Sequence, residues 1–253
     1  MAPPDSDPPS TALAGRRLLV VGASSGIGRA LALEAAASGA AVALTARRLA
    51  LLEQVAAEAG SRAVALPCDV SDPSACSILA DEAAAALDGL DAVLYVAGAA
   101  YLGPLAQASA ASWRAMLATN VVGAALVTAG ALPYLRSAPA PVVAYVSSHS
   151  VRRPWPGLVP YAASKAALET MALGLRAEEP WLRVLRVSVG PTITGFSDRW
   201  DPAVAGPAFE RWAAEGYLVH EPQEASDTAR RIVAALADGT GPDDIEVIGP
   251  EAG

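Results

Sequence analysis

The sequence predicts an α/β fold, a single doubly wound domain in which helices cover both faces of a seven-stranded parallel sheet. From Arg16 onward, short β-branched runs alternate with longer alanine-rich segments of helical composition, which is the pattern of stacked βαβ units. The chain has 253 residues, 53% of them hydrophobic, which is enough for one sizeable core and requires no second domain.

The short apolar runs predict seven strands, at residues 17–21, 41–45, 63–66, 92–96, 142–147, 184–189 and 245–248. Six helices are expected between them, at residues 26–38, 49–59, 73–87, 111–132, 161–177 and 225–237. Because a helix separates each strand from the next, the strands are expected to run parallel.

Two parts of the chain lie outside this alternation. Residues 1–12 are rich in proline and have no basic cluster ahead of an apolar run, so we expect a disordered tail rather than a signal or transit peptide, followed by the domain at residues 13–253. Residues 195–221 hold no strand but five aromatic side chains, which predicts an insertion that covers a ligand site. A surface excursion with a small core of its own is the alternative.

Composition limits the partners of this chain. The formal net charge of −8 argues against nucleic acid and against an anionic membrane surface, and favours a small-molecule substrate. The alanine-rich apolar stretch at residues 121–132 is shorter than the roughly 18 residues that a membrane span requires, so a cytoplasmic protein is expected. Cys68 and Cys76 have no histidine nearby to complete a metal site, so no metal is expected and both thiols are expected to be reduced.

The segment VGASSGIGRA follows the first expected strand and opens the first expected helix. Its glycines allow a tight turn and a close approach of a phosphate to the backbone, where the helix N-terminus favours an anion. This context predicts a dinucleotide site, with a plain glycine turn as the alternative. The residues expected to contact the cofactor here are Gly22, Ser24, Ser25, Gly26, Ile27 and Gly28.

The second expected strand ends in LTARR. A site that prefers NAD would place a carboxylate on the adenosine ribose, but Ala46 stands at that position and Arg47 follows it, which favours the 2′-phosphate of NADP(H). Arg47 and Arg48 as solvated charges at a helix start are the competing interpretation. Asp69, followed by Val70 after the third strand, is assigned to the adenine end, although Asp69 could equally cap the next loop.

The segment PYAASKAAL places Tyr161 and Lys165 four residues apart, so on a helix they share one face. A nearby ammonium favours the phenolate and is expected to lower the tyrosine pKa from about 10 toward working pH. Ser148, thirteen residues before Tyr161 at the end of the fifth expected strand, could hold a substrate oxygen. A buried tyrosine with a lysine stem lying along an apolar surface is the structural alternative.

Together, GASSGIG, Asn120 in ATNVVG, Ser148 in VSS, and YAASK resemble the short-chain dehydrogenase/reductase family over about residues 13–249. The resemblance implies a Rossmann-type fold and a nicotinamide cofactor. It also implies that Tyr161 is the catalytic acid/base, that Ser148 polarises the carbonyl, and that Lys165 binds the nicotinamide ribose while lowering the tyrosine pKa. Asn120 would support a proton-relay water.

The sequence departs from the family pattern at the fourth expected strand. Where the family usually has two asparagines before Ala-Gly, this chain has Tyr95 and Val96 before Ala97 and Gly98. Backbone contacts of Ala97 and Gly98 to the cofactor are still expected, but the sheet-bracing role of the asparagine is expected to be lost.

Two further departures fall in loops. After the sixth expected strand the family commonly has proline, then glycine, ahead of a threonine, whereas this chain reads SVGPTIT; Thr192 and Thr194 remain the expected cofactor contacts. The threonine that opens the family's glycine motif is replaced by Val21.

Trp155, together with the aromatic insertion, is expected to bound the substrate pocket, and Arg152 and Arg153 are candidate anion contacts. His149 directly follows Ser148 at a strand end, where neighbours face opposite ways, so it is expected to line or rim the pocket rather than act as a base. His220 follows the last aromatic residue of the insertion and is a weaker candidate for a substrate contact.

These observations predict an NADP(H)-dependent oxidoreductase that transfers hydride between nicotinamide and a carbonyl or secondary alcohol on an apolar or ring-containing substrate. A non-catalytic NADP(H) sensor or scaffold is the alternative from another class, and imine reduction or epimerisation are related reactions. The resemblance also implies a homodimer or homotetramer that pairs through the helices expected at residues 111–132 and 161–177.

Overall fold

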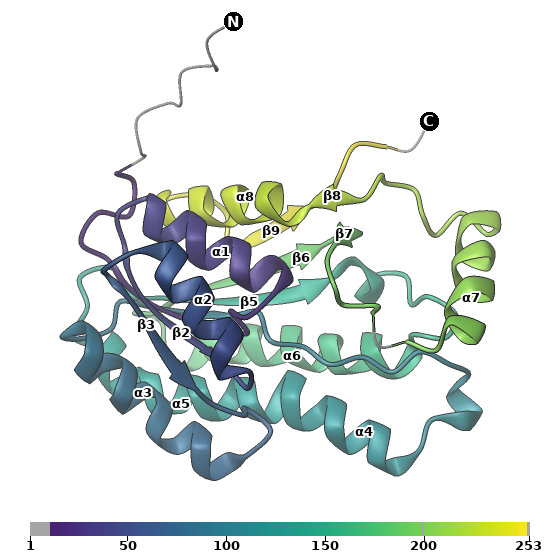
Figure 1. Cartoon of the computed structure of the whole chain (residues 1–253), viewed down its shortest axis with the longest axis horizontal. Coiled ribbons are helices and arrows are strands. Elements are labelled where there is room, and N and C mark those ends of the chain that lie inside the picture. The colour runs from purple at the N-terminus through teal and green to yellow at the C-terminus, as the bar shows by residue number, and fades with distance from the viewer. Residues whose placement is uncertain (1–10, 199, 252–253) are drawn as a thin grey trace, which may run out of the picture.

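Seven parallel strands form the central sheet (Figure 1). They are β1 Arg17–Val21, β2 Ala41–Ala46, β3 Ala63–Pro67, β4 Ala92–Tyr95, β5 Val142–Ser148, β6 Arg183–Val189 and β9 Asp244–Val247. All seven expected strands are confirmed, with ends that differ by at most one residue. The computed structural model describes residues 11–198 and 200–251, so most of the expected tail, residues 1–10, lies outside the described residues.

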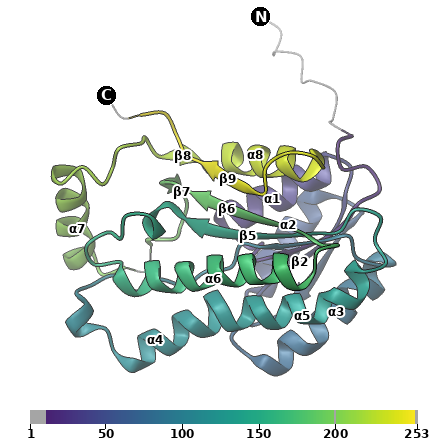
Figure 2. The same cartoon turned by 180° about the vertical axis from the view of Figure 1, so that it is seen from behind.

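Helices cover both faces of the sheet (Figures 1 and 2). One face carries α1 Gly26–Ala37, α2 Leu49–Ala59 and α8 Ala225–Ala237, and the other carries α3 Pro73–Leu87, α4 Ala110–Leu117, α5 Gly123–Leu135 and α6 Val159–Glu178. Figure 1 shows α7, Pro202–Ala214, apart from both layers and beyond the arrowheads of β5 and β6. This end of the sheet is where the carboxyl ends of the strands meet.

Burial on both faces explains why the strands are so apolar. In β1, Leu18 and Val20 belong to the core shared with α1 and α8, whereas Leu19 and Val21 belong to the core shared with α3 and α5. Each of these four side chains is at most 1% exposed. Parallel strands buried in this way read as continuous apolar runs, which is the pattern that located them in the sequence.

The order of the strands locates a ligand crevice. Across the sheet the order is β3-β2-β1-β4-β5-β6-β9, so the chain turns in opposite directions after β1 and after β4. The loops that leave the carboxyl ends of these two neighbouring strands therefore diverge and leave a crevice, the usual ligand position in doubly wound sheets.

One long helical segment, Ala110–Leu135, takes the place of the single helix expected over residues 111–132. It consists of α4 and α5 joined by a π-type turn, Ala118–Val122. By length, and by the mean hydropathy of 1.7 of an 18-residue window within it, this segment is apolar enough to cross a membrane, contrary to the expectation drawn from residues 121–132. In the fold α5 packs against α3, and the π-type turn packs against α6, as in a core helix.

The interval at residues 195–221 contains α7, a helix that the sequence analysis did not predict. Its start is stabilised by Asp201, whose side chain accepts a hydrogen bond from the Ala203 amide at 2.9 Å, but Pro207 inside the helix weakens the helical pattern. Trp212 is 1% exposed and packs in a third apolar cluster with Tyr161. Tertiary packing of this side chain, rather than local propensity, accounts for the helix.

Two short strands flank the same interval. β7, Thr192–Ile193, and β8, Gln223–Glu224, pair in parallel and form a second, two-stranded sheet. A two-residue strand has too few positions for an alternating pattern, so neither strand was predicted. Their pairing brings the two ends of the interval together beside the crevice.

A buried ion pair joins β1 to the residue before β4. Asp91 is 3% exposed, and its Oδ2 accepts hydrogen bonds from the Arg17 amide at 2.9 Å and from Arg17 Nε at 3.0 Å. Its Oδ1 accepts a third from Arg17 Nη2 at 2.7 Å. Burial alone would raise the pKa of this carboxyl, but the hydrogen bonds and charge of Arg17 outweigh burial and lower the pKa.

We predict that Asp91→Asn lowers the free energy of unfolding by about 2 kcal/mol, because it leaves the Arg17 guanidinium without its ionic partner. The folded pKa of Asp91 is lowered, so its contribution is present above the unfolded pKa and is lost as pH falls through the folded value. Urea unfolding at several pH values measures both effects. Glu82→Gln, which neutralises an exposed carboxylate of α3, is the control, and equal stability of the two variants would contradict the prediction.

Candidate active site

The glycine turn between β1 and α1 lies in the crevice. Gly22 has φ 95° and Gly26 has φ 54°, conformations that favour glycine. A Cβ on Gly22 would lie 2.7 Å from the Ala97 amide nitrogen, and a Cβ on Gly28 would lie 2.1 Å from the Gly22 carbonyl oxygen. The three glycines therefore allow this turn to lie against the loop after β4 and leave the start of α1 uncovered.

The start of α1 is suited to a pyrophosphate. The preceding residue, Ser25, makes no side-chain cap to the helix, so the first N–H groups and the positive dipole end face the crevice. A Cβ on Gly26 would contact Thr194 Cβ at 3.1 Å, so Thr194 lies against the turn, as its assignment to the cofactor site requires. Ile27 packs partly into the core, and the Ser24 side chain points to a basic residue.

That basic residue is Arg48, which the sequence analysis did not assign to the cofactor site. Arg48 Nη2 donates to Ser24 Oγ at 3.0 Å and to Ser25 Oγ at 2.9 Å, so the guanidinium lies across the glycine turn. Arg47 is exposed and acts on Asp69 through its charge. Position alone could not distinguish the two arginines, because the side-chain directions depend on how α2 begins.

The two residues that the sequence analysis assigned to the adenine end lie in the turn after β3. Asp69 Oδ1 accepts hydrogen bonds from the Ser71 amide at 3.0 Å and from Ser71 Oγ at 2.7 Å, which is the loop-capping alternative stated above. Burial would raise the pKa of Asp69, but the Ser71 hydrogen bonds and the Arg47 charge lower it overall. Val70 is buried in the core beside α3.

The loop after β4 and β7 hold the other expected cofactor contacts. A Cβ on Gly98 would lie 3.6 Å from Lys165 Nζ and 3.7 Å from Asn120 Oδ1, so Gly98 faces the reactive residues, and Ala97 adjoins Gly22. Thr192 Oγ1 donates to the Gly190 carbonyl at 3.0 Å, a contact within its own loop.

The candidate reactive residues meet between α6 and β5. Tyr161 and Lys165 lie on α6 and are 9% and 3% exposed, and the Lys165 Nζ is 5.9 Å from the centroid of the Tyr161 ring. Lys165 Nζ donates to the Val146 carbonyl of β5 at 2.8 Å. At the end of β5, Ser148 lies close enough to the Tyr161 phenol to act on its pKa, and its Oγ pairs with Ser150 Oγ at 2.9 Å. The structure thus brings together the three residues expected to share one spot.

The pKa of Tyr161 does not follow the expectation from sequence. Burial raises the pKa of Tyr161 to about 12, while the nearby Ser148 hydroxyl acts in the opposite direction. Burial likewise lowers the pKa of Lys165 to about 8, against the charge of Glu169, which raises it. The effect of burial therefore outweighs that of Ser148, and the raised pKa keeps the Tyr161 phenol protonated at neutral pH.

Asn120 lies in the π-type turn, fully buried. Its Oδ1 accepts from the Ala99 amide at 2.7 Å, and its Nδ2 donates to the Ala99 carbonyl at 2.8 Å and to Ser164 Oγ at 2.8 Å. Ser164 Oγ in turn donates to the Tyr161 carbonyl at 2.7 Å. The Asn120 side chain therefore joins the loop after β4 to the start of α6. The proton-relay role implied for Asn120 stays a prediction.

Tyr95, which stands where the family usually has an asparagine, joins β4 to the π-type turn. It is fully buried in β4, and its hydroxyl donates a hydrogen bond to the Thr119 carbonyl in the π-type turn. A π-type turn leaves carbonyl groups without their usual helical partners, and this phenol satisfies one of them next to Asn120. Tyr95 therefore ties β4 to the helix through a longer side chain than the family's asparagine.

Aromatic rings continue from the reactive tyrosine into the insertion. Phe196 lies 5.5 Å from Tyr161 between ring centroids, Trp200 lies 5.7 Å from Phe196, and Trp212 lies 6.3 Å from Trp200. Trp155 packs on Trp212 at 5.0 Å. The insertion thus forms an apolar wall next to the Tyr161 side chain.

The basic and imidazole groups near this wall are engaged with the protein. The Arg153 guanidinium lies 3.8 Å from the centroid of the Tyr217 ring and donates to backbone carbonyls, and Arg152 pairs with Glu246. Both arginines, which were candidate anion contacts, therefore already have partners within the protein. His149 packs edge-on against His220 at 5.8 Å between centroids, and burial lowers the pKa of His149. Among the described residues, no group of three or more His, Cys, Asp or Glu side chains could hold a metal.

The chain is similar to proteins of one family. The family model described as short chain dehydrogenase matches residues 16–204. A short chain dehydrogenase of Pseudocercospora fijiensis is 35% identical over 71% of this chain and 60% of its own length. The 11-beta-hydroxysteroid dehydrogenase 1A of Arabidopsis thaliana is 40% identical over 64% of this chain, which spans only 49% of that protein.

Two solved structures agree over nearly the whole chain. A short chain dehydrogenase from Burkholderia cenocepacia in complex with NADP superposes with a TM-score of 0.83 and 28% identity, covering 94% of this chain and 98% of that one. A dehydrogenase/reductase from Sinorhizobium meliloti superposes with a TM-score of 0.79 and 29% identity, covering 94% and 95%. The fold, the glycine turn and these similarities show that the chain belongs to the short-chain dehydrogenase/reductase family of oxidoreductases.

Proposed function

We propose that the chain is an NADP(H)-dependent oxidoreductase that interconverts a carbonyl and a secondary alcohol. The observation that carries this proposal is the meeting of the Tyr161 phenol, the Ser148 hydroxyl and the buried Lys165 ammonium beside Gly98. When bound, the nicotinamide supplies or accepts the hydride. The start of α1 would hold the pyrophosphate, and the loop after β4 would adjoin the nicotinamide end.

The proposed roles follow from the protonation states. A phenol whose pKa is raised to about 12 is protonated in neutral water, so Tyr161 can donate a proton to the oxygen of a carbonyl under reduction. Ser148, which lies beside that phenol, would hold the same oxygen. Lys165 contributes positive charge where negative charge develops on oxygen.

The preference for NADP(H) is supported by the basic end of the crevice. Ala46 carries no carboxylate to bind a ribose 2′-hydroxyl, whereas Arg48 lies across the glycine turn and Arg47 stands beside it. Two guanidinium groups suit a 2′-phosphate. The Burkholderia cenocepacia structure with NADP supports the same preference.

The apolar wall supports a substrate with apolar or ring character. Phe196 and Trp200 present aromatic surface close to Tyr161, and the nearby Arg152 and Arg153 have partners within the protein. We also propose a cytoplasmic homodimer or homotetramer. Leu117 on α4 and Leu173 on α6 are exposed apolar side chains on the helices through which pairing was expected, and both cysteines are free.

We predict that Tyr161→Phe lowers kcat at least 100-fold and leaves the NADPH dissociation constant within about threefold, because only the proton-transferring hydroxyl is lost. Oxidation of NADPH with a panel of aldehydes and ketones measures kcat, and fluorescence titration measures binding. Tyr134→Phe, which removes a hydroxyl bonded to Asp81 on the exposed side of α5, is the matched control.

Undiminished turnover in Tyr161→Phe would contradict the acid/base assignment. Tight NADPH binding by the unaltered protein, with no turnover of any carbonyl or alcohol tested, would favour the non-catalytic sensor instead.

We predict that Arg47→Ala and Arg48→Ala each weaken NADP(H) binding about tenfold and leave NAD(H) binding nearly unchanged, because each removes a cation from the 2′-phosphate site. Arg62→Ala is the control. This exposed arginine precedes β3, at the amino ends of the strands, whereas Arg47 and Arg48 follow the carboxyl end of β2. Titration of all four proteins with both cofactors gives the comparison. Equal losses for NADP(H) and NAD(H) would show that the arginines support the turn rather than the phosphate.

A further inference from the structure

Three ionisable side chains lie in sequence along one face of α6. Tyr161, Lys165 and Glu169 are each four residues apart, so successive turns of the helix carry a phenol, an ammonium and a carboxylate. Lys165 is the only lysine of the chain, all other basic residues apart from the two histidines being arginine. Glu169 belongs to no motif that the sequence analysis used.

The carboxylate of Glu169 is held from two strands. Its Oε1 accepts a hydrogen bond from Ser147 Oγ of β5 at 2.5 Å, and its Oε2 lies 3.5 Å from Arg186 Nη1 of β6. The Glu169 side chain is 18% exposed. Both oxygens are therefore tethered to the sheet, on the face that α6 covers.

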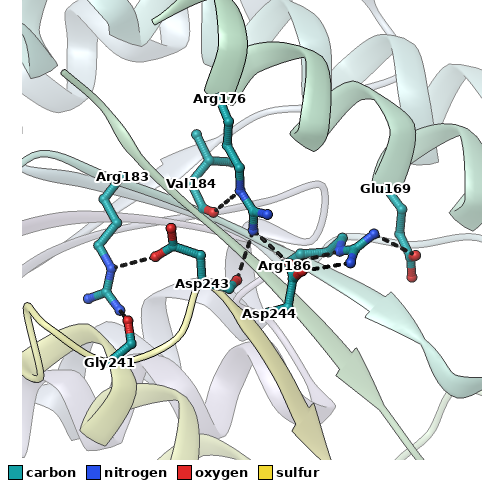
Figure 3. A network of polar contacts seen from close by, with 8 residues as sticks. All are labelled: Glu169, Arg176, Arg183, Val184, Arg186, Gly241, Asp243 and Asp244. Atoms are coloured by element: carbon teal, nitrogen blue, oxygen red, sulfur yellow. Dashed lines mark hydrogen bonds and ion pairs between the residues drawn. The ribbon is translucent and has the colours of Figure 1, made fainter. Parts of the chain in front are cut away.

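Arg186 pairs more closely with Asp244 than with Glu169. Its Nη2 lies 2.8 Å from Asp244 Oδ2 and its Nε donates to Asp244 Oδ1 at 3.0 Å, a two-point pair that is closer than its contact with Glu169 (Figure 3). Figure 3 shows this network continuing through Arg176, which pairs with Asp244 at 2.7 Å, and through Arg183, which pairs with Asp243 at 2.9 Å. The arginines are thus matched by the aspartates of β9 and the residue before it.

Of the carboxylates in this network, that of Glu169 has the longest contact with an arginine. A small polar cavity of about 70 Å³ beside Glu169 is lined by two cations and three carboxylates, namely Arg152, Arg186, Glu169, Asp244 and Glu246. Arg152 pairs with Glu246, and Arg186 pairs most closely with Asp244. Glu169, whose 3.5 Å contact with Arg186 is longer than these pairs, lies one helical turn from Lys165.

Lys165 needs such a partner because it is deeply buried. Its ammonium has one hydrogen bond to a backbone carbonyl, that of Val146, and burial disfavours its charged form strongly enough to bring its pKa to about 8. The charge of Glu169 opposes that effect. Of the other groups around the pair, Tyr161 is neutral at this pH and Ser147 carries no charge.

We propose that Glu169 is a positioning residue whose carboxylate, fixed by Ser147 and Arg186, keeps the buried Lys165 ammonium charged. Glu169 touches neither the phenol nor the crevice, so it acts on the reaction only through Lys165. The effect on turnover rests on the proposed function, whereas the effect on the charge of Lys165 does not.

The single lysine allows a direct test. Protein labelled with ¹³C-lysine gives one lysine side-chain signal, and its dependence on pH reports the titration of Lys165 without a substrate. The midpoint is expected near 8 in the unaltered protein and roughly one unit lower in Glu169→Gln, because a charged partner one helical turn away is removed. Glu169→Asp, which keeps the charge, is expected to restore most of the shift.

Glu178→Gln is the matched control, since it neutralises an exposed glutamate at the far end of the same helix. Its midpoint is expected to equal that of the unaltered protein. An unchanged midpoint in Glu169→Gln would overturn the inference. If Glu169→Gln does not fold, Ser147→Ala provides the test, because it removes the hydrogen bond to one oxygen of the Glu169 carboxylate. This variant is expected to lower the Lys165 midpoint by a smaller amount. An unchanged midpoint in Ser147→Ala would also overturn the inference.

Activity gives the second readout. If a charged Lys165 is needed for turnover, kcat/KM declines as pH rises through the lysine pKa, and this decline moves to lower pH in Glu169→Gln by the same amount as the midpoint. A shifted midpoint in a protein that turns over no carbonyl substrate would support the role of Glu169 and contradict the proposed function. An active enzyme whose Lys165 midpoint is unshifted in Glu169→Gln would support the proposed function and contradict the role of Glu169.

Discussion

Burial of an ammonium group between α6 and β5 is the constraint on which the site depends. Lys165 is 3% exposed and has a 2.8 Å hydrogen bond to the Val146 carbonyl, so its charge must be supported by protein groups rather than by water. The same burial surrounds Tyr161 and raises its pKa to about 12. The polar groups around the pair are accordingly fixed in place, through Ser148 on one side and Glu169 on the other.

The crevice depends on contacts that fix three separate loops relative to one another. Glycines let the turn after β1 approach the loop after β4, and Asn120 joins that second loop to α6 through Ala99 and Ser164. Tyr95 supports the π-type turn that carries Asn120. In this chain, which lacks the family's usual asparagine in β4, the phenol of Tyr95 joins that strand to the π-type turn.

Sequence patterns located the strands and the reactive residues because burial on two faces and helical spacing leave strong signals. They gave the strands of the sheet to within one residue, and they grouped Tyr161, Lys165 and Ser148 correctly in space. They missed α7, whose prolines weaken its local pattern and whose formation depends on packing of Trp212. The distinction between Arg47 and Arg48, the rise of the Tyr161 pKa and the place of Glu169 depend on side-chain direction and local dielectric, which spacing does not encode.

The choice of arginine over lysine everywhere except position 165 has a consequence for how the molecule responds to alkaline solution. Guanidinium groups keep their protons far above the pH at which amines lose theirs. The ion pairs along β6 and β9 would therefore persist in alkaline solution, whereas the side-chain amine of Lys165 would lose its proton. Amine-directed acylating reagents would find no lysine other than the one enclosed by the fold, so the rate at which they modify it would report how often that enclosure opens.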